Sequence, residues 1–213
     1  MSKQIEMFRE KGYVLVKNMV SKETAQMLFN YLVCESISKK IENPETQLEG
    51  DDQVPNSLSA INGDLIFESL LFGLKEKMEL KTGLSLLPTY SYRRLYKHGN
   101  ILHKHKDRPS CEVSATIKLS DNGGYNWPIW MEDTAFELED GDAVIYRGCD
   151  LTHWREPCGG PRKYIMGQVF THYVDVNGPF AEYAFDNTND NSNRFETRKK
   201  AYENFQHYCK QLS

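Results

Sequence analysis

The chain has 213 residues, and its 26 Lys and Arg against 30 Asp and Glu give a formal net charge of -4. This length is enough for one domain with a sizeable hydrophobic core, and nothing in the composition marks a second domain. The mild acidity without a basic run argues against a nucleic-acid partner, and the lack of any long apolar run argues against a membrane partner.

The cysteines indicate a cellular compartment rather than a disulfide framework or a metal site. Their number is odd, their spacings are irregular, and no Cys-x-x-Cys pair occurs. A disulfide framework or a structural zinc site is therefore not expected, and a reducing cytoplasm fits best. The first residues contain no apolar signal segment, which also favours the cytoplasm.

The first 85 residues carry mainly helical signals. Ser21 and Asp64 are typical N-cap residues, and Gly12 and Gly83 are typical of helix C-termini. The expected elements are a helix over 4–11, a strand over 13–16, a helix after Ser21, a long polar loop over 39–60, and a helix from Asp64 to Gly83. Because such a long loop is unusual in a compact chain, we expect it to be a mobile lid or rim.

From residue 86 the apolar period changes from 3.6 to 2, which indicates strands. The expected strands are 89–97, 101–106, 111–119, 127–131, 134–138, 142–147, 151–155 and 163–175. Short strands separated by Gly, Pro, Asn and Asp are typical of a sandwich or jelly roll. The sequence thus predicts one mainly β domain over 1–213, with a helical buttress over about 1–85, a β core over about 86–178 and a final helix over about 190–211.

One motif in the β region carries metal chemistry. In an extended strand, His105 and Asp107 lie on one face because they are two residues apart. An imidazole and a carboxylate, with a second histidine from elsewhere, form the facial triad that binds Fe(II) and leaves positions open. His153 is the natural third ligand, because strands far apart in sequence can be neighbours in a jelly roll. An isolated histidine is more often a packing or surface residue.

The run from Tyr90 to Tyr173 resembles the Fe(II)- and 2-oxoglutarate-dependent dioxygenases, specifically their prolyl-hydroxylase-like branch. The matching pieces occur in the family's order: Tyr96-x-x-Gly99…His105-x-Asp107, Gly123-Gly124, the stretch Glu139–Tyr146, and His153-x-x-x-Pro157-(x)5-Lys163. The resemblance implies a double-stranded β-helix (jelly roll) core. It also implies Fe(II) held by His105, Asp107 and His153, with 2-oxoglutarate and O2 as cosubstrates and ascorbate as a supporting reductant.

The far carboxylate of 2-oxoglutarate needs a cation, since a buried unpaired carboxylate is very costly. Lys163 stands ten residues after His153, the spacing usual in the family, and Arg162 stands nine after it. On a strand over 163–175, Lys163 would share a face with Gly167, which would leave room for the ligand. Strand parity therefore favours Lys163, with Arg162 as the open alternative. Tyr96 resembles a tyrosine that contacts the cosubstrate, although a buried aromatic residue fits that position equally well.

The expected reaction is hydroxylation of a peptide or protein side chain, or of an amino-acid-like small molecule, with release of succinate and CO2. The substrate and the oligomeric state are left open. The first alternative is a cupin-type metal enzyme without 2-oxoglutarate, in which His103 joins the metal shell. The second is a non-catalytic metal-binding module on the same fold. His98, His172 and His207 are interpreted as structural or surface histidines.

Overall fold

Two antiparallel sheets form the centre of the protein, which a computed structural model describes over residues 2–43, 50–187 and 194–212. The larger sheet has six strands in the order β1-β8-β5-β10-β3-β2, and the smaller has four in the order β4-β9-β6-β7. The strands are β1 (Tyr13–Val16), β2 (Ser59–Asn62), β3 (Leu86–Lys97), β4 (Leu102–His105), β5 (Val113–Asp121), β6 (Ile129–Met131), β7 (Thr134–Phe136), β8 (Ala143–Tyr146), β9 (His153–Arg155) and β10 (Ile165–Asp175). The prediction of a mainly β fold is confirmed.

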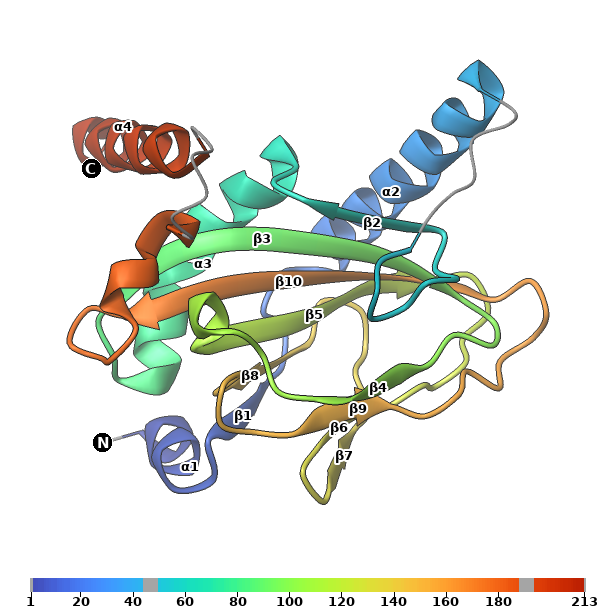
Figure 1. The fold of residues 1–213 in the computed structure, drawn as a ribbon, viewed down its shortest axis with the longest axis horizontal. Helices are drawn as coiled ribbons and strands as arrows, with labels where there is room; N and C mark the ends of the chain where they lie inside the picture. The colour runs from blue at the N-terminus through green and yellow to red at the C-terminus, as the bar shows by residue number, and fades with distance from the viewer. Residues whose placement is uncertain (1, 44–49, 188–193, 213) are drawn as a thin grey trace.

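The chain moves back and forth between the sheets. From β3 it crosses to β4 in the small sheet, returns to β5, crosses to β6 and β7, and then alternates through β8, β9 and β10. In Figure 1 the small sheet lies below the large one and faces it. This alternation is the path of a jelly roll, and it brings β4 and β9 side by side although a long stretch of sequence separates them.

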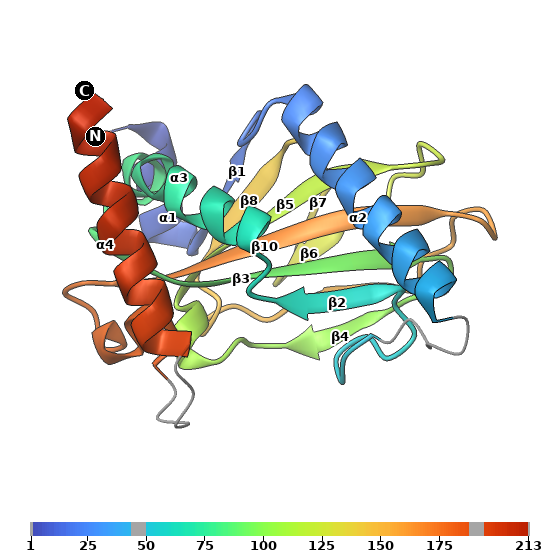
Figure 2. The same ribbon diagram turned by 90° about the horizontal axis from the view of Figure 1, so that it is seen from above.

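Four helices flank the sheets: α1 (Lys3–Lys11), α2 (Lys22–Glu42), α3 (Leu65–Thr82) and α4 (Arg194–Leu212). The expected caps form, since Ser21 accepts a hydrogen bond from Thr24 N and Asp64 accepts one from Ile66 N. Gly12 and Gly83 adopt the left-handed conformation that ends α1 and α3. The view from above in Figure 2 shows α2 and α3 crossing the outer face of the large sheet.

The large sheet is covered on both faces. One hydrophobic cluster joins its outer face to α1, α2 and α3, and a second fills the space between the two sheets. In β10, Val169 and Tyr173 belong to the outer cluster, whereas Met166 and Phe170 belong to the inner one. The even-numbered residues of β10 therefore face the interior of the jelly roll.

This orientation overturns the strand-parity argument made for Lys163. A Cβ built on Gly167 would lie 2.8 Å from Cδ2 of Phe29 in α2, so Gly167 makes room for a helix and not for a ligand. The strand also begins two residues later than expected, at Ile165, and Lys163 lies in the exposed turn before it. The turn is closed by a hydrogen bond of 2.7 Å from Tyr164 N to Pro161 O.

The polar stretch 39–60 divides into several parts. Its first residues complete α2, which ends at Glu42, and its last two begin β2, which was not predicted. Residues 44–49 lie outside the described part of the chain. Residues 50–58 pack against the jelly roll, and Val54 is only 1% exposed within the inner cluster. The prediction of a mobile lid is not tested by this arrangement.

None of the helices in the described ranges is both long and apolar enough to cross a membrane.

Candidate functional site

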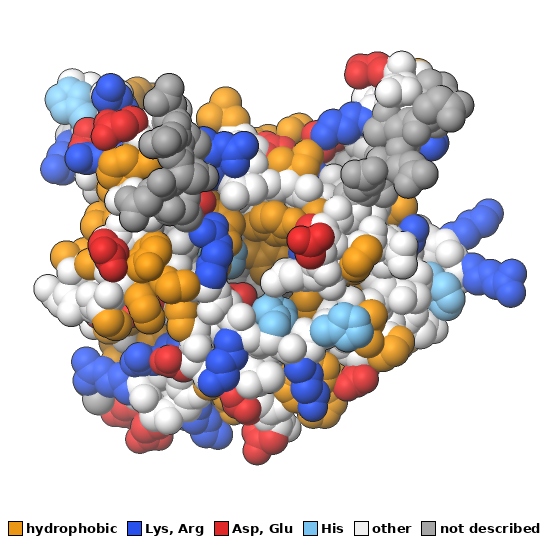
Figure 3. Space-filling view, viewed as in Figure 1, with side chains coloured by type: hydrophobic (Ala, Val, Ile, Leu, Met, Phe, Trp, Pro, Cys, Tyr) orange, Lys and Arg blue, Asp and Glu red, His pale blue; other side chains and the backbone are white. Residues whose placement is uncertain are grey.

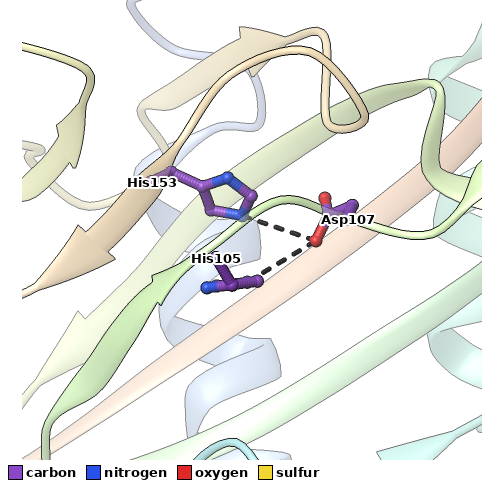
Figure 4. Close-up of side chains that lie close together, drawn as sticks. All are labelled: His105, Asp107 and His153. Carbon is purple, nitrogen blue, oxygen red and sulfur yellow. Dashed lines mark ion pairs between the residues drawn. The ribbon is translucent and has the colours of Figure 1, made fainter.

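The three predicted metal ligands lie together at one end of the small sheet. His105 ends β4, His153 begins β9, and the two residues are paired across these antiparallel strands. Nε2 of His105 lies 3.6 Å from Oδ1 of Asp107, and Nε2 of His153 lies 3.4 Å from the same oxygen. Figure 4 shows both rings directed at the carboxylate. All three donor atoms lie within 4.8 Å of one another, which is a suitable arrangement for one small metal ion.

Hydrogen bonds on the side away from the candidate metal site hold each of these groups in place. Nδ1 of His105 lies 2.8 Å from the carbonyl of His103, and Nδ1 of His153 lies 3.1 Å from the carbonyl of Leu151. Because a carbonyl can only accept, each ring carries a proton on Nδ1, which leaves Nε2 as the nitrogen that can bind a metal. Such outer contacts are typical of histidines that ligate metals.

Asp107 is held as firmly as the two histidines. Its backbone N–H donates to Gly148 O at 2.8 Å, and the hydroxyl of Tyr146 donates to Oδ2 at 3.3 Å. A Cβ on Gly148 would lie 2.5 Å from that Oδ2, so only glycine permits this close approach. Oδ1 therefore faces the imidazoles while Oδ2 is anchored to the protein.

Electrostatics favour the charged form of Asp107. Burial alone would raise the pKa of the carboxyl, but the contacts with His105 and His153 outweigh burial and bring the pKa well below its ordinary value. For His105, burial would lower the pKa, and the hydrogen bond to Asp107 reverses that effect. The site thus offers one anion and two imidazoles, which is the donor set that Fe(II) takes in a facial triad.

A second group of candidate ligands shares Asp107. It consists of Asp107, Cys111 and His172, whose donor atoms also lie within 4.8 Å of one another. Burial raises the pKa of the Cys111 thiol well above its ordinary value, and its sulfur lies 3.1 Å from the hydroxyl of Tyr90. Since metals bind the thiolate, this group fits a metal less well than the triad does.

A cavity of about 440 Å³ opens beside the triad. Figure 3 shows its mouth as a hollow with hydrophobic side chains inside and charged and histidine side chains around it. Its lining includes His105, Asp107, His153, Arg94, Phe170 and His172.

The cavity contains a buried cation that the sequence analysis did not single out. Arg94 lies in β3 and is 1% exposed. Its Nη1 donates to the hydroxyl of Tyr96 at 3.0 Å, and its Nη2 contacts the carboxylate of Asp51. Its Nε is buried and has no hydrogen-bond partner in the part of the chain that is described. Buried polar groups are seldom left in this state unless something else completes them.

A second buried arginine lies close to the first. Arg155 in β9 is 2% exposed, and its guanidinium donates to Trp127 O and to Oε1 of Gln168. The Tyr96 ring links the two arginines, since its centroid is 5.4 Å from Cζ of Arg94 and 5.9 Å from Cζ of Arg155. Among the described residues, no carboxylate forms an ion pair with Arg155, and burial lowers the pKa of its guanidinium.

The structure separates the three residues predicted to contact the cosubstrate. Lys163 and Arg162 are exposed and do not line the cavity. Tyr96 is fully buried behind the cavity, where it packs edge-on against Trp127 and accepts a hydrogen bond from Arg94. An arginine at an alternate position among Tyr90, Tyr92 and Tyr96 was the sequence signal for the buried cation, and it was missed.

The side chain of His103 is exposed, and the residue meets the site only through its backbone carbonyl. It does not belong to either group of candidate ligands found among the described residues. The cupin-type alternative, which requires the His103 imidazole in the metal shell, therefore has no support in the geometry.

No protein family and no curated protein sequence matches the chain. Several solved structures share its fold. A prolyl-4-hydroxylase from Pseudomonas putida matches with a TM-score of 0.54 at 15% identity, covering 79% of this chain and 96% of that one. The α-ketoglutarate-dependent carbocyclase SnoK from nogalamycin biosynthesis matches with a TM-score of 0.61 at 17% identity, covering 83% and 85%. EctD from S. alaskensis, crystallised with 2-oxoglutarate and 5-hydroxyectoine, matches with a TM-score of 0.57 at 12% identity, covering 83% and 76%. At these identities the similarity establishes the fold, and the resemblance seen in the sequence is confirmed at that level.

Proposed function

We propose that this protein is an Fe(II)- and 2-oxoglutarate-dependent oxygenase that hydroxylates an amino-acid-like small molecule or a peptide side chain. The observation that carries the proposal is the convergence of two imidazole Nε2 atoms and one carboxylate oxygen within 4.8 Å, beside a cavity that holds a buried arginine. His105, Asp107 and His153 would hold the metal. When bound, Fe(II) with 2-oxoglutarate and O2 supplies the oxidising chemistry and leaves succinate and CO2.

The residues of the chain supply position and charge. The Nδ1 contacts of the two histidines keep both Nε2 atoms directed at one point, so no reorientation of the rings is needed when a metal binds. Tyr146 holds the second oxygen of Asp107 away from that point. The remaining sides of a metal bound there would face the cavity and be open to ligands.

We further propose that Arg94 binds the far carboxylate of 2-oxoglutarate. Its charge opposes the contacts with Asp107 and His103 that raise the pKa of His105, so the guanidinium and the candidate metal site share one electrostatic environment. Arg94 lines the cavity that they share, and its buried Nε has no hydrogen-bond partner among the described residues. Charge-assisted hydrogen bonds to a carboxylate are among the stronger contacts available to such a group.

The balance of buried charge supports the same assignment. Two of the buried arginines, Arg94 and Arg155, lie beside the Tyr96 ring, and among the described residues only Asp51 forms an ion pair with either of them. A buried charge is costly unless it is paired. One further carboxylate next to this pair would neutralise it, and the far carboxylate of 2-oxoglutarate provides that charge. Asp51 and the far carboxylate of the cosubstrate can then neutralise the two arginines at the same time.

The proposed substrate class is supported by the names of the matching structures. The prolyl-4-hydroxylase and EctD names refer to proline and ectoine chemistry in the matching structures, which supports an amino-acid-like substrate here. The reducing cytoplasm and the supporting role of ascorbate remain predictions.

The test begins with anaerobic protein loaded with Fe(II). Titration with 2-oxoglutarate should produce the visible iron-to-cosubstrate charge-transfer band, and Asp107→Ala should not produce it. Under air with ascorbate, peptides and amino acids are then screened for stimulated succinate formation. If the wild-type protein binds iron and gives no band with 2-oxoglutarate, the proposed function is wrong, whatever the screen shows.

A further inference from the structure

His172 is a cavity-lining histidine that the proposed reaction does not yet use. It lies near the end of β10 on the face turned to the interior, is 5% exposed, and lines the same cavity as the triad. Its ring is packed between two aromatic rings. The centroid of Tyr90 lies 4.6 Å away, and Phe170 is stacked at 6.5 Å with an angle of 4° between the ring planes. The orientation of the ring is thus defined by packing.

The hydrogen bonds behind His172 determine which nitrogen carries the proton. The hydroxyl of Ser114 donates to the carbonyl of Cys111 at 3.0 Å, and a carbonyl cannot return a proton. Oγ of Ser114 also lies 2.7 Å from Nδ1 of His172. Because the only hydroxyl proton is already used, Nδ1 must donate to Oγ, and the neutral ring is left with a lone pair on Nε2. Nε2 has no hydrogen-bond partner within the described ranges of the chain.

The wall next to His172 is largely aromatic. Tyr90 and Phe170 contribute ring faces, and Cys111 contributes a buried thiol. Since one ring nitrogen of His172 lies within 4.8 Å of a carboxylate oxygen of Asp107, the ring lies beside one of the candidate metal ligands. A group that entered here would therefore meet an apolar surface and one hydrogen-bond acceptor close to the reacting centre.

We propose that His172 is a substrate-binding residue whose Nε2 accepts a hydrogen bond from an N–H or O–H group of the substrate, next to the aliphatic carbon that reacts. This inference rests on the proposed function and narrows its substrate class. The substrate would be an amine, amide or alcohol with its donor at the end that enters the cavity. A carboxylate or phosphate at that end would face an acceptor and the anionic Asp107. Arg108, a cation in the same cavity wall, already forms an ion pair with Asp186 at 2.8 Å, so such groups are disfavoured there.

The first test concerns the proton on His172 and needs no substrate. The ¹⁵N-labelled protein is loaded with Zn(II), a diamagnetic substitute for Fe(II), together with 2-oxoglutarate. Long-range ¹H–¹⁵N spectra should show the proton on Nδ1. Ser114→Ala removes its acceptor and should abolish that preference. A proton on Nε2 in the wild-type protein would overturn the proposal.

The second test uses two lactams, of which the second has a methyl group in place of the N–H donor. We expect 2-pyrrolidinone to shift the His172 Nε2 resonance, and N-methyl-2-pyrrolidinone to bind about tenfold more weakly, since a buried acceptor would be left unpaired. His172→Phe keeps an aromatic ring and should remove the difference between the lactams, followed through backbone amide shifts. Equal binding of both lactams, or binding of neither, overturns the assignment.

The two proposals fail in different ways. If His172 were instead a metal ligand, His172→Phe would lose Zn(II), whereas we expect metal content and 2-oxoglutarate affinity to stay within about twofold of wild type. If the protein bound neither Zn(II) nor 2-oxoglutarate, the proposed oxygenase would be wrong, but the proton position and the lactam comparison would still report on His172.

Discussion

The substitution Arg94→Met tests the most specific part of the proposed site. Methionine keeps much of the side-chain volume and removes the charge and every N–H. The far carboxylate of 2-oxoglutarate would then be desolvated without its partner, which costs about 2–5 kcal/mol for a buried charged pair. At about 1.4 kcal/mol per tenfold, the dissociation constant of 2-oxoglutarate should rise by roughly thirty- to several-thousand-fold. Fe(II) should still bind, because Arg94 is not among the candidate ligands.

The assay is an anaerobic titration of the Fe(II)-loaded protein with 2-oxoglutarate, followed by the charge-transfer band. Lys163→Met and Arg162→Met are matched controls, since they remove one positive charge each from exposed positions outside the cavity. We expect both controls to titrate like the wild-type protein. Arg94→Lys should fall between, because lysine restores the charge without the planar fork.

Two patterns of results would refute the assignment of the cation to Arg94. If Arg94→Met titrated normally while Lys163→Met or Arg162→Met lost the band, the cation would come from the turn before β10, as the sequence pattern suggested. The turn would then have to fold inward when the cosubstrate binds. If all three variants titrated normally, Arg155 would become the candidate cation.

Three further predictions concern the same site. Asp107→Ala removes the only anionic ligand of the proposed triad. Its iron affinity, measured by competition with a chelator, should fall by more than about 100-fold, which is more than the usual loss for a residue that only supports a ligand. An affinity close to that of the wild-type protein would contradict the triad. Tyr146→Phe removes only the hydroxyl that anchors Oδ2, so the same assay should show a loss of about tenfold, and an unchanged affinity would mean that the anchor is unimportant. Asp51→Asn removes the anion paired with Arg94, so 2-oxoglutarate should bind more tightly by about 1 kcal/mol, or roughly fivefold. Weaker binding in the titration would show instead that Asp51 holds Arg94 in position.

The predictable parts of the molecule are those with local physical causes. Ser21, Asp64, Gly12 and Gly83 satisfy the ends of helices within a few residues, and these helices lie close to the expected ranges. The His105-x-Asp107 spacing is equally local. His153 could be added because a jelly roll makes distant strands neighbours, and β4 and β9 are paired as this requires.

The cosubstrate cation could not be derived in the same way. The choice between Lys163 and Arg162 depended on which face of the last strand points inward. That face can be read from a sequence only when one side of the strand is exposed and the other is buried. Apart from its end residues, β10 is buried along its whole length, between the helices on one side and the cavity on the other. The pattern therefore contained no information about the direction of Gly167.

Arg94 was hidden for a related reason. Its role depends on the loop around Asp51, which contacts Arg94 from 43 residues earlier in the chain. No local pattern specifies that contact. Arg94 is surrounded by groups from three separate segments of the chain, which contribute Asp51, the Tyr96 hydroxyl and the Arg155 guanidinium. This surrounding exists only once the fold is assembled. A buried charge with an incomplete set of partners is a property of that assembly.

Gly167 offers a direct test of the orientation of β10. In the structure, a methyl group at this position would press on Phe29 and Leu32 of α2, at 2.8 and 3.4 Å. Gly167→Ala should therefore cost about 1–3 kcal/mol of unfolding free energy, the usual range for overpacking, which urea denaturation would measure. The affinity for 2-oxoglutarate should remain unchanged, because the methyl group would lie on the helix side of the sheet. If Gly167 instead faced the ligand, the same substitution would weaken 2-oxoglutarate binding and leave the unfolding free energy almost unaltered. The two orientations of β10 thus predict opposite results in two independent measurements on a single variant.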